Sequence, residues 1–240
     1  MIGTNKNNKE IIRDFQKKDN RIKVIENKVN IGLIQSLNKT IERVNTKYIA
    51  RMDSDDISDI RRLEKEIKFI ENNNQYALVG SRANYINEKG IYKTSHFFGE
   101  VKQDMLIKFC VFFHPSLLIK TEILKKIGGY DNYIRNEDYA LYLKLYYMGY
   151  KGYVLEDVLL NYRQNIESFR RKKYCDRVVE FKLRKKYLKL LNIKYPKRVL
   201  YAVKPLIVGC IPNKIMYLYK KIKKEKKWKQ LKLILLIFGI

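Results

Sequence analysis

The segment Tyr48-Ile49-Ala50-Arg51-Met52-Asp53-Ser54-Asp55-Asp56 passes from apolar residues directly into three carboxylates within four positions. Its first five residues predict a short buried strand, and open α/β sheets build their ligand sites where such strands end. Carboxylates spaced Asp-x-Asp can share one divalent ion, and Mg²⁺ or Mn²⁺ accepts such oxygens together with substrate phosphates. An acidic turn that caps the following helix is the alternative, because Asp also favours the first turn of a helix. The spacing alone does not separate these two interpretations.

Strand-like and helix-like segments alternate on both sides of this segment. Apolar residues at helical spacing predict the helices, and short apolar runs bounded by turn residues predict the strands. This alternation predicts an α/β fold with a mostly parallel sheet flanked by helices. The expected helices are 9–17, 33–44, 58–72 with Ser58 as its cap, 119–127 and 139–148, and the expected strands are 21–26, 48–52, 76–81 and 152–155.

The net charge of +26 is concentrated in the last third of the chain. Residues 170–240 hold 23 Lys/Arg against 3 Asp/Glu, whereas residues 1–169 hold 28 against 22. Such a basic tail is typical of proteins that contact nucleic acid or an anionic membrane. The sequence shows neither a zinc-knuckle spacing nor an RNA-binding aromatic signature, so we expect no specific nucleic acid as a partner. We therefore divide the chain into a domain over 1–169 and a basic helical tail over 170–240.

Within this tail, residues 171–191 predict a long basic helix, and the prolines around 199–211 predict that no regular helix forms there. The basic run 220–229, which contains Trp228, leads into the apolar end Leu231–Ile240. This end is shorter than the about 20 apolar residues that a spanning helix needs. It is typical of docking at an anionic membrane surface, and folding back onto the domain is the alternative.

Three scattered cysteines predict neither a disulfide framework nor a metal cluster, which favours a reducing cytosol. The first residues lack the apolar core of a signal peptide.

Several segments together resemble a known family. Residues 48–58, Tyr-Ile-Ala-Arg-Met-Asp-Ser-Asp-Asp-Ile-Ser, resemble the donor-site segment of family 2 glycosyltransferases, which have the Rossmann-like GT-A fold. The resemblance covers about residues 3–170 and rests on motifs in the family's order. Besides 48–58 these are Asn30-Ile31-Gly32-Leu33 with Asn38, then His114-Pro115-Ser116, Gly128-Gly129-Tyr130-Asp131, Glu137-Asp138 and Tyr162-Arg163.

The resemblance implies a metal-dependent transfer of a sugar, with inversion, from a nucleotide donor to a surface-polysaccharide or lipid-linked acceptor at the inner face of the cell membrane. Asp138 would deprotonate the acceptor hydroxyl, and Glu137 would orient the loop or the acceptor, although a helix cap with a first-turn acid is the alternative for this pair. A UDP-sugar is the expected donor. The matching positions imply metal ligands Asp53, Asp55 and Asp56 for Mg²⁺ or Mn²⁺, donor-side residues Asn30, Gly32, Asn38, Arg51, Asp53 and Asp55, and acceptor-side residues His114, Gly129 and Tyr130, with a structural role as the alternative for His114.

The sequence also departs from the family. Members open with two apolar strands, the second ending in Asp-Asp-Gly-Ser, and Met1-Ile2 stands where that second strand would end. We therefore expect a sheet that lacks these strands and has an unpaired edge. Asn165 occupies a position where many relatives carry His. An inactive truncated remnant that acts as a membrane-bound interaction partner is the alternative function, and a nucleic-acid-binding module, supported by charge alone, is a third.

Overall fold

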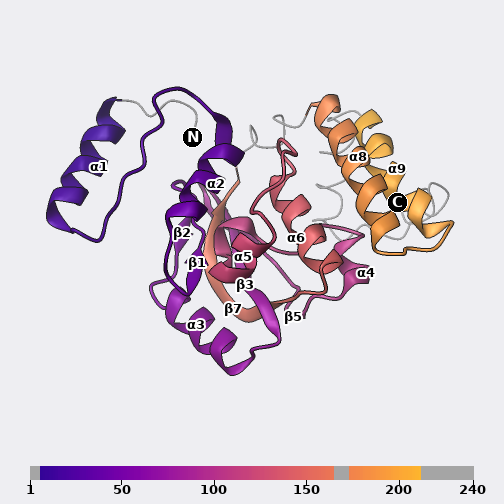
Figure 1. Ribbon diagram of the computed structural model, residues 1–240, viewed down its shortest axis with the longest axis horizontal. Helices are drawn as coiled ribbons and strands as arrows, with labels where there is room; N and C mark the ends of the chain where they lie inside the picture. The colour runs from indigo at the N-terminus through magenta and orange to yellow at the C-terminus, as the bar shows by residue number, and fades with distance from the viewer. Residues whose placement is uncertain (1–5, 165–172, 212–240) are drawn as a thin grey trace.

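A computed structural model of the chain describes residues 6–164 and 173–211, with side chains from residue 9 onward. Its centre is a seven-stranded sheet in the order β1-β6-β3-β7-β2, with β4 paired to β3 and β5 to β7 (Figure 1). The strands are β1 (Tyr48–Ala50), β2 (Ile57–Ser58), β3 (Tyr76–Asn87), β4 (Gly90–Thr94), β5 (Gly99–Glu100), β6 (Leu118–Lys120) and β7 (Lys151–Arg163).

The prediction of an α/β fold is confirmed, but the sheet is mixed instead of mostly parallel. The long pair β3–β7 is parallel, whereas β1–β6, β3–β6, β3–β4, β2–β7 and β5–β7 are antiparallel. The strands of two to five residues pair only antiparallel, and two of them, β4 and β5, lie in a section for which no element was predicted. Such short strands carry too few residues to show a period of two.

Helices cover both faces of this sheet. Leu78 and Val79 are neighbours on β3 and belong to different core clusters, because successive side chains of a strand point to opposite faces. The larger cluster includes residues of five helices on one face, and the smaller one includes Ile70 of the helix on the other face. The helices are α1 (Lys6–Lys18), α2 (Gly32–Arg43), α3 (Arg62–Asn72), α4 (Gln103–Leu106), the 3₁₀ turn η1 (His114–Ser116), α5 (Thr121–Lys126), α6 (Glu137–Tyr147), α8 (Tyr174–Leu190) and α9 (Lys197–Cys210).

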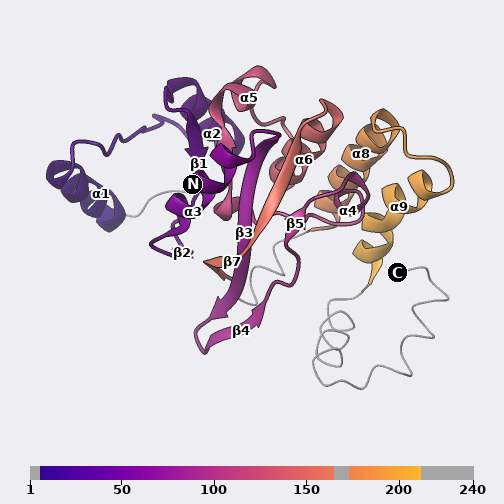
Figure 2. The same ribbon diagram turned by 90° about the horizontal axis from the view of Figure 1, so that it is seen from below.

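The N-terminal arm lies apart from the rest of the described fold. Helix α1 forms close to its predicted bounds, and its Ile11 and Phe15 are exposed (Figures 1 and 2). The strand predicted over 21–26 is wrong, because no strand in the described part of the chain lies beside this segment to take its backbone hydrogen bonds. Strand β1 lies at one edge of the sheet. It pairs with β6 on one side, and no other described strand pairs with it.

The starts of α3 and α5 also differ from the prediction. Ser58 lies in β2 and its hydroxyl donates to the Asp59 carbonyl, so it does not cap α3, which begins at Arg62. The helix predicted over 119–127 is shorter, since its first residues form β6 between β1 and β3. In both cases a partner strand, which is distant in sequence, decides the local structure.

Residues 199–211, for which no regular helix was predicted, lie almost wholly within α9. Pro205 is buried where α9 packs on α8. The burial of this apolar face compensates for the backbone hydrogen bond that proline cannot donate.

Helix α8 matches the predicted basic helix and packs into the main core through Leu183 and Tyr187. The division of the chain between residues 169 and 170 stays a prediction. The apolar end and the basic run before it lie outside the described residues. Among the helices that the structure describes, none is long and apolar enough to cross a bilayer.

Candidate active site

The acidic segment begins where β1 ends, as predicted. The Arg51 N–H donates to the Leu117 carbonyl at 2.8 Å, which continues the pairing of β1 with β6. The buried guanidinium of Arg62 donates to the Arg51 carbonyl at 3.1 Å and to the Pro115 carbonyl at 2.8 Å. Arg62 thereby ties the start of the acidic segment to η1. Sequence reasoning missed this contact, since an arginine on an amphipathic helix is normally expected at the surface.

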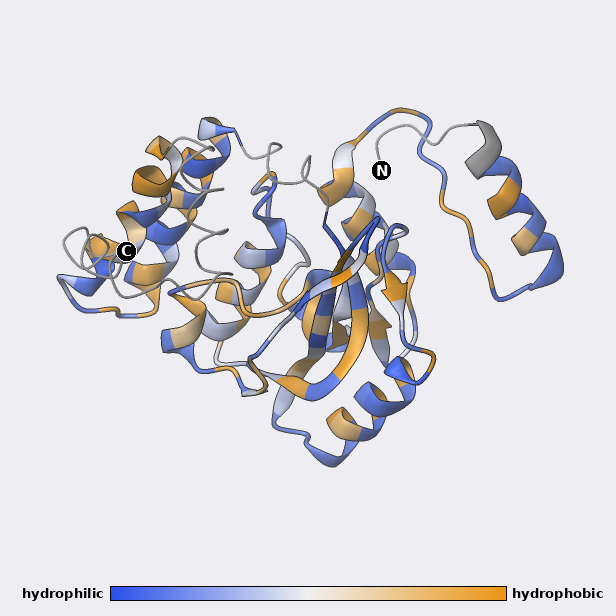
Figure 3. Ribbon diagram, turned by 180° about the vertical axis from the view of Figure 1, so that it is seen from behind, coloured by the Kyte–Doolittle hydropathy of each residue, from blue (hydrophilic) through white to orange (hydrophobic). Residues whose placement is uncertain are grey.

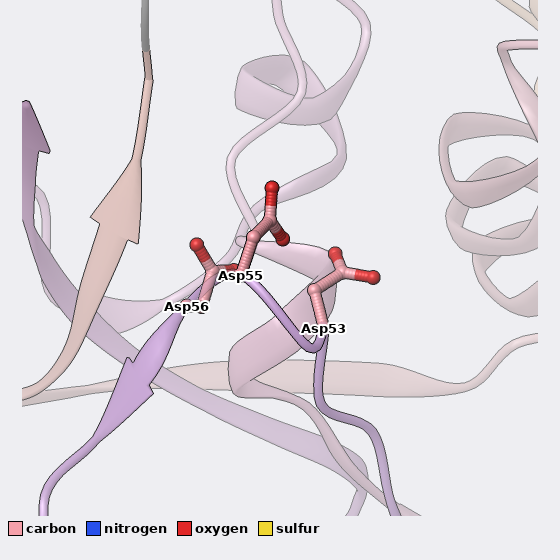
Figure 4. A group of neighbouring side chains, drawn as sticks. All are labelled: Asp53, Asp55 and Asp56. Atoms are coloured by element: carbon pink, nitrogen blue, oxygen red, sulfur yellow. The ribbon is translucent and has the colours of Figure 1, made fainter. Parts of the chain in front are cut away.

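Asp53, Asp55 and Asp56 come together as a group, each with one carboxylate oxygen within 4.8 Å of the others (Figure 4). Strand β2 follows directly and pairs with β7, so that the group lies beside the end of β7. There Arg163 donates its backbone N–H to Asp56 Oδ1 at 2.7 Å and its Nε to the Asp55 carbonyl at 2.8 Å. Two strands thus hold the acidic loop.

The charges of this group suit a divalent cation. Burial and the neighbouring Asp55 and Asp53 carboxylates raise the pKa of Asp56 to about 6. Its Oδ2 atom is buried without a hydrogen-bond partner in the described part of the chain. Arg51 forms an ion pair with Asp53. A buried carboxylate oxygen with no donor, next to two further carboxylates, fits the oxygen-rich ligand set that Mg²⁺ and Mn²⁺ accept.

The predicted acceptor-side loop is linked to α2. Asn38 donates its Nδ2 to the Tyr130 carbonyl at 2.9 Å, and its Oδ1 accepts from the Tyr130 N–H at 2.8 Å. Gly128 and Gly129 both have positive φ, and a Cβ on Gly129 would lie 2.4 Å from Asn38 Oδ1. Only glycine therefore allows this close approach. The role of Asn38 in donor binding stays a prediction.

His114 and Tyr130 form one buried pair in which His114 Nε2 lies 2.7 Å from the Tyr130 hydroxyl. Burial, and then the nearby charge of Arg51, hold the pKa of His114 well below its usual range, so the imidazole is neutral. Burial raises the pKa of Tyr130 as well. His114 thus has a structural partner in the predicted acceptor-side loop, and direct contact with an acceptor stays a prediction.

Glu137 and Asp138 form the first turn of α6, with Asn136 as the N-cap residue. Asp138 Oδ1 accepts from the Tyr139 N–H at 2.7 Å. Burial and the adjacent Asp138 charge raise the pKa of Glu137. First-turn acids are favoured by the helix dipole, so this position is compatible with both interpretations of the pair.

Tyr162 of β7 connects the two groups of carboxylates. Burial, and then the negative charges of Asp56, Asp53 and Asp138, raise its pKa to about 12. The charges at the start of α6 and in the acidic loop therefore act on the same Tyr162 hydroxyl.

On the predicted donor side, Asn30 Oδ1 accepts from the Gly32 N–H at 3.0 Å at the start of α2, where both residues are exposed.

The chain is similar in sequence to known proteins. A family model described as glycosyl transferase family 2 matches residues 3–144. An uncharacterized glycosyltransferase of Methanocaldococcus jannaschii is 38% identical over 164 residues, which cover 66% of this chain and 56% of that protein. The putative glycosyltransferase EpsE of Bacillus subtilis is 30% identical over 205 residues, covering 84% of this chain and 73% of its own. A UDP-Gal:alpha-D-GlcNAc-diphosphoundecaprenol beta-1,3-galactosyltransferase of Escherichia coli is 27% identical over 205 residues, covering 80% of this chain and 72% of that one.

Solved structures resemble the fold. The structure of S. aureus TarS 1-349 with UDP-GlcNAc has a TM-score of 0.61 at 15% identity, covering 87% of this chain and 60% of that one. The mannosyltransferase PcManGT from Pyrobaculum calidifontis, with GDP-Man and Mn²⁺, has a TM-score of 0.53 at 15% identity, covering 86% and 57%. The chain therefore spans 56–60% of the length of the first of these relatives and the first of these structures. Both neighbours have the GT-A fold.

Proposed function

This chain belongs to glycosyltransferase family 2, and on that premise we propose that it transfers a sugar, with inversion, from a nucleoside-diphosphate sugar to a polysaccharide or lipid-linked acceptor. The observation that carries the proposal is the carboxylate group at the end of β1, and the charge of Asp138 at the start of α6 supports it, because Asp138 raises the pKa of Tyr162 together with Asp53 and Asp56. A displacement with inversion needs charge neutralisation on the leaving-group side and a base on the opposite side.

On the donor side, Asp53, Asp55 and Asp56 would hold Mg²⁺ or Mn²⁺. When bound, the ion neutralises the charge that develops on the leaving diphosphate. Support comes from the unpartnered oxygen of Asp56 and from PcManGT, whose structure contains Mn²⁺ and GDP-Man. TarS was solved with UDP-GlcNAc, which favours a UDP-sugar as the donor. Asn30, Gly32, Asn38 and Arg51 are the further donor-side residues that we propose.

On the acceptor side, Asp138 would take the proton of the attacking hydroxyl. Glu137 would orient the acceptor. The loop with Gly129 and Tyr130, together with His114 of η1, would form the wall beside the acceptor. The E. coli relative that acts on a diphosphoundecaprenol-linked sugar favours a lipid-linked acceptor. A reaction with such a substrate takes place at a membrane, so we propose the inner face of the cell membrane as the location.

The test is binding of UDP to the purified chain with and without Mn²⁺, in wild type and in Asp55→Asn. We expect Mn²⁺-dependent binding that Asp55→Asn abolishes. Asp14→Asn, an exposed aspartate of α1, is the matched control and should bind as wild type does. A folded chain that binds neither UDP nor GDP with Mn²⁺ contradicts the proposal and favours an inactive remnant that acts as an interaction partner.

Transfer itself is tested with a panel of nucleotide sugars and a prenyl-diphosphate-linked sugar as the acceptor. Appearance of the extended lipid product supports a lipid-linked acceptor, whereas transfer to free oligosaccharide alone favours a polysaccharide acceptor and contradicts a lipid-linked one.

A further inference from the structure

Helix α9 has two apolar faces. The inner face packs on α8 through Ala202 and Pro205, which are both buried. Gly209 lies on this side too, because a Cβ there would come within 3.1 Å of Tyr174 and Arg177 of α8. This face explains why the helix forms.

The outer face is also apolar, and it is exposed. Val199, Leu200 and Ile207 expose 45%, 46% and 40% of their surface. Spacings of three and four residues place these side chains on one side of the helix together with Val203 and Cys210. Figure 3 shows that α9 is hydrophobic over most of its length, and Figures 1 and 2 show it beyond α8, at the end of the molecule opposite α1. We call these five residues the outer stripe.

The segment that carries the outer stripe, residues 173–211, exposes charge of one sign. The acidic residues of this range are Asp176 and Glu180, and both are buried beside arginines of α8 or the α6 region. The exposed charged side chains are therefore all basic. They are Lys173, Lys182, Lys185, Lys186, Lys189, Lys194 and Lys197.

We propose that the outer stripe docks on the surface of an anionic lipid membrane. Apolar side chains flanked by lysines are the arrangement with which a helix lies in a membrane interface, because the stripe enters the acyl boundary and the lysines meet anionic headgroups. A second copy of this chain would instead bring two cationic surfaces together, which is unfavourable. Nucleic acid would match the lysines but leave the stripe uncovered. The proposal does not depend on sugar transfer.

The first measurement is cosedimentation of the full chain with vesicles of phosphatidylcholine, with or without phosphatidylglycerol. We expect binding to the anionic vesicles and weaker binding to the neutral ones. In Leu200→Gln/Ile207→Gln the partition coefficient should fall roughly tenfold or more, since two half-exposed apolar side chains are lost. The matched control is Ile60→Gln/Ile91→Gln, which changes two exposed isoleucines elsewhere and should bind like wild type.

Residues beyond 211 are present in all these proteins, so the difference between variants reports on α9. Wild-type binding by the Leu200→Gln/Ile207→Gln chain, or equal binding to both kinds of vesicle, overturns the proposal. So does a wild-type chain that stays in the supernatant.

A second measurement keeps the four aliphatic side chains of the outer stripe and labels its cysteine. Cys110, Cys175 and Cys210 are exposed. A polarity-sensitive dye on Cys210, in a Cys110→Ser/Cys175→Ser chain, should shift its emission to the blue when anionic vesicles are added. The control dye sits at Asn72→Cys in a chain with all three cysteines changed to serine, at the end of α3, and should not shift. Sedimentation with vesicles without a shift at Cys210 would mean that another segment binds, which overturns the assignment to α9.

Discussion

The backbone N–H of Arg163, at the end of β7, donates a hydrogen bond of 2.7 Å to Asp56 Oδ1, 107 residues earlier in the chain. The side chain of Arg163 adds a bond of 2.8 Å to the Asp55 carbonyl. The carboxylates of the acidic loop are thus oriented by a strand that pairs with neither β1 nor β6. Residues that orient metal ligands commonly affect metal affinity without touching the ion.

Replacement of Arg163 should therefore weaken metal binding. In Arg163→Met the bond to the Asp55 carbonyl is lost, while the backbone bond to Asp56 can still form. We expect Mn²⁺-dependent UDP affinity to fall roughly tenfold or more, as for other residues that support metal ligands. Calorimetric titration measures the change. Arg43→Met, on the exposed side of α2, is the control and should leave the affinity unchanged. Equal affinity in both variants would show that the loop holds its shape without Arg163.

Asn38 should contribute to stability through the loop that it holds. Asn38→Ala leaves the N–H and the carbonyl of Tyr130 without their partners, which costs about 1–3 kcal/mol of unfolding free energy for each group left buried and unpaired. Asn38→Asp keeps the acceptor for the N–H and should lose less. Urea denaturation measures both, with Asn45→Ala, an exposed asparagine, as the control.

The same variants separate two roles of Asn38. If Asn38 only links α2 to Tyr130, the folded Asn38→Asp protein binds UDP like wild type. A large loss of UDP affinity at unchanged stability would instead assign Asn38 to the donor site.

Much of the acidic segment could be predicted because its structure is local. An apolar strand followed by carboxylates needs only neighbouring residues to be recognised, and α6 follows from apolar spacing in the same way. The clamp between Asn38 and Tyr130 spans 92 residues, and no local pattern marks it. The resemblance to a family brought both residues into the site but could not say that they touch.

The burial of charged side chains is the other feature that the sequence pattern did not predict. Arg62 and Glu66 lie on the inner side of α3, yet a sequence pattern treats charged residues as the solvent side of a helix. Buried Arg62 donates to two backbone carbonyls, one of Arg51 directly after β1 and one of Pro115 in η1. Only the tertiary structure shows that these two carbonyls lie within reach of Arg62.

Glu66 should make the stability of the protein depend on pH. It is fully buried, and burial raises its pKa to about 8 although the nearby Arg62 lowers it. Between its ordinary value of 4.5 and about 8, the folded state holds a proton that the unfolded state has released. The free energy of unfolding therefore falls as the pH rises through this window, by at most about 1.4 kcal/mol per pH unit.

Glu66→Gln keeps the shape of the side chain and removes the titrating proton, so this contribution to the slope should disappear. Urea denaturation across the window measures the slope in both proteins. Glu64→Gln changes an exposed glutamate on the same helix and should retain the wild-type slope. An unchanged slope in Glu66→Gln would show that Glu66 is not the group responsible.

Asp138→Asn decides between a catalytic base and a first-turn helix acid. As a base, Asp138 takes the acceptor proton in the transition state, so its loss should lower turnover by roughly 10²–10⁴-fold. The affinity for UDP with Mn²⁺ should stay unchanged, because the donor-side carboxylates are intact. As a helix acid, Asp138 would contribute only through the dipole of α6, and its loss would lower stability by about 0.3–1 kcal/mol without a specific loss of turnover.

Turnover with a lipid-linked acceptor and urea denaturation are measured on the same samples. Glu122→Gln, an exposed acid in the first turn of α5, is the matched control and should change turnover little. Turnover that falls only in proportion to the folded fraction would rule out Asp138 as the base.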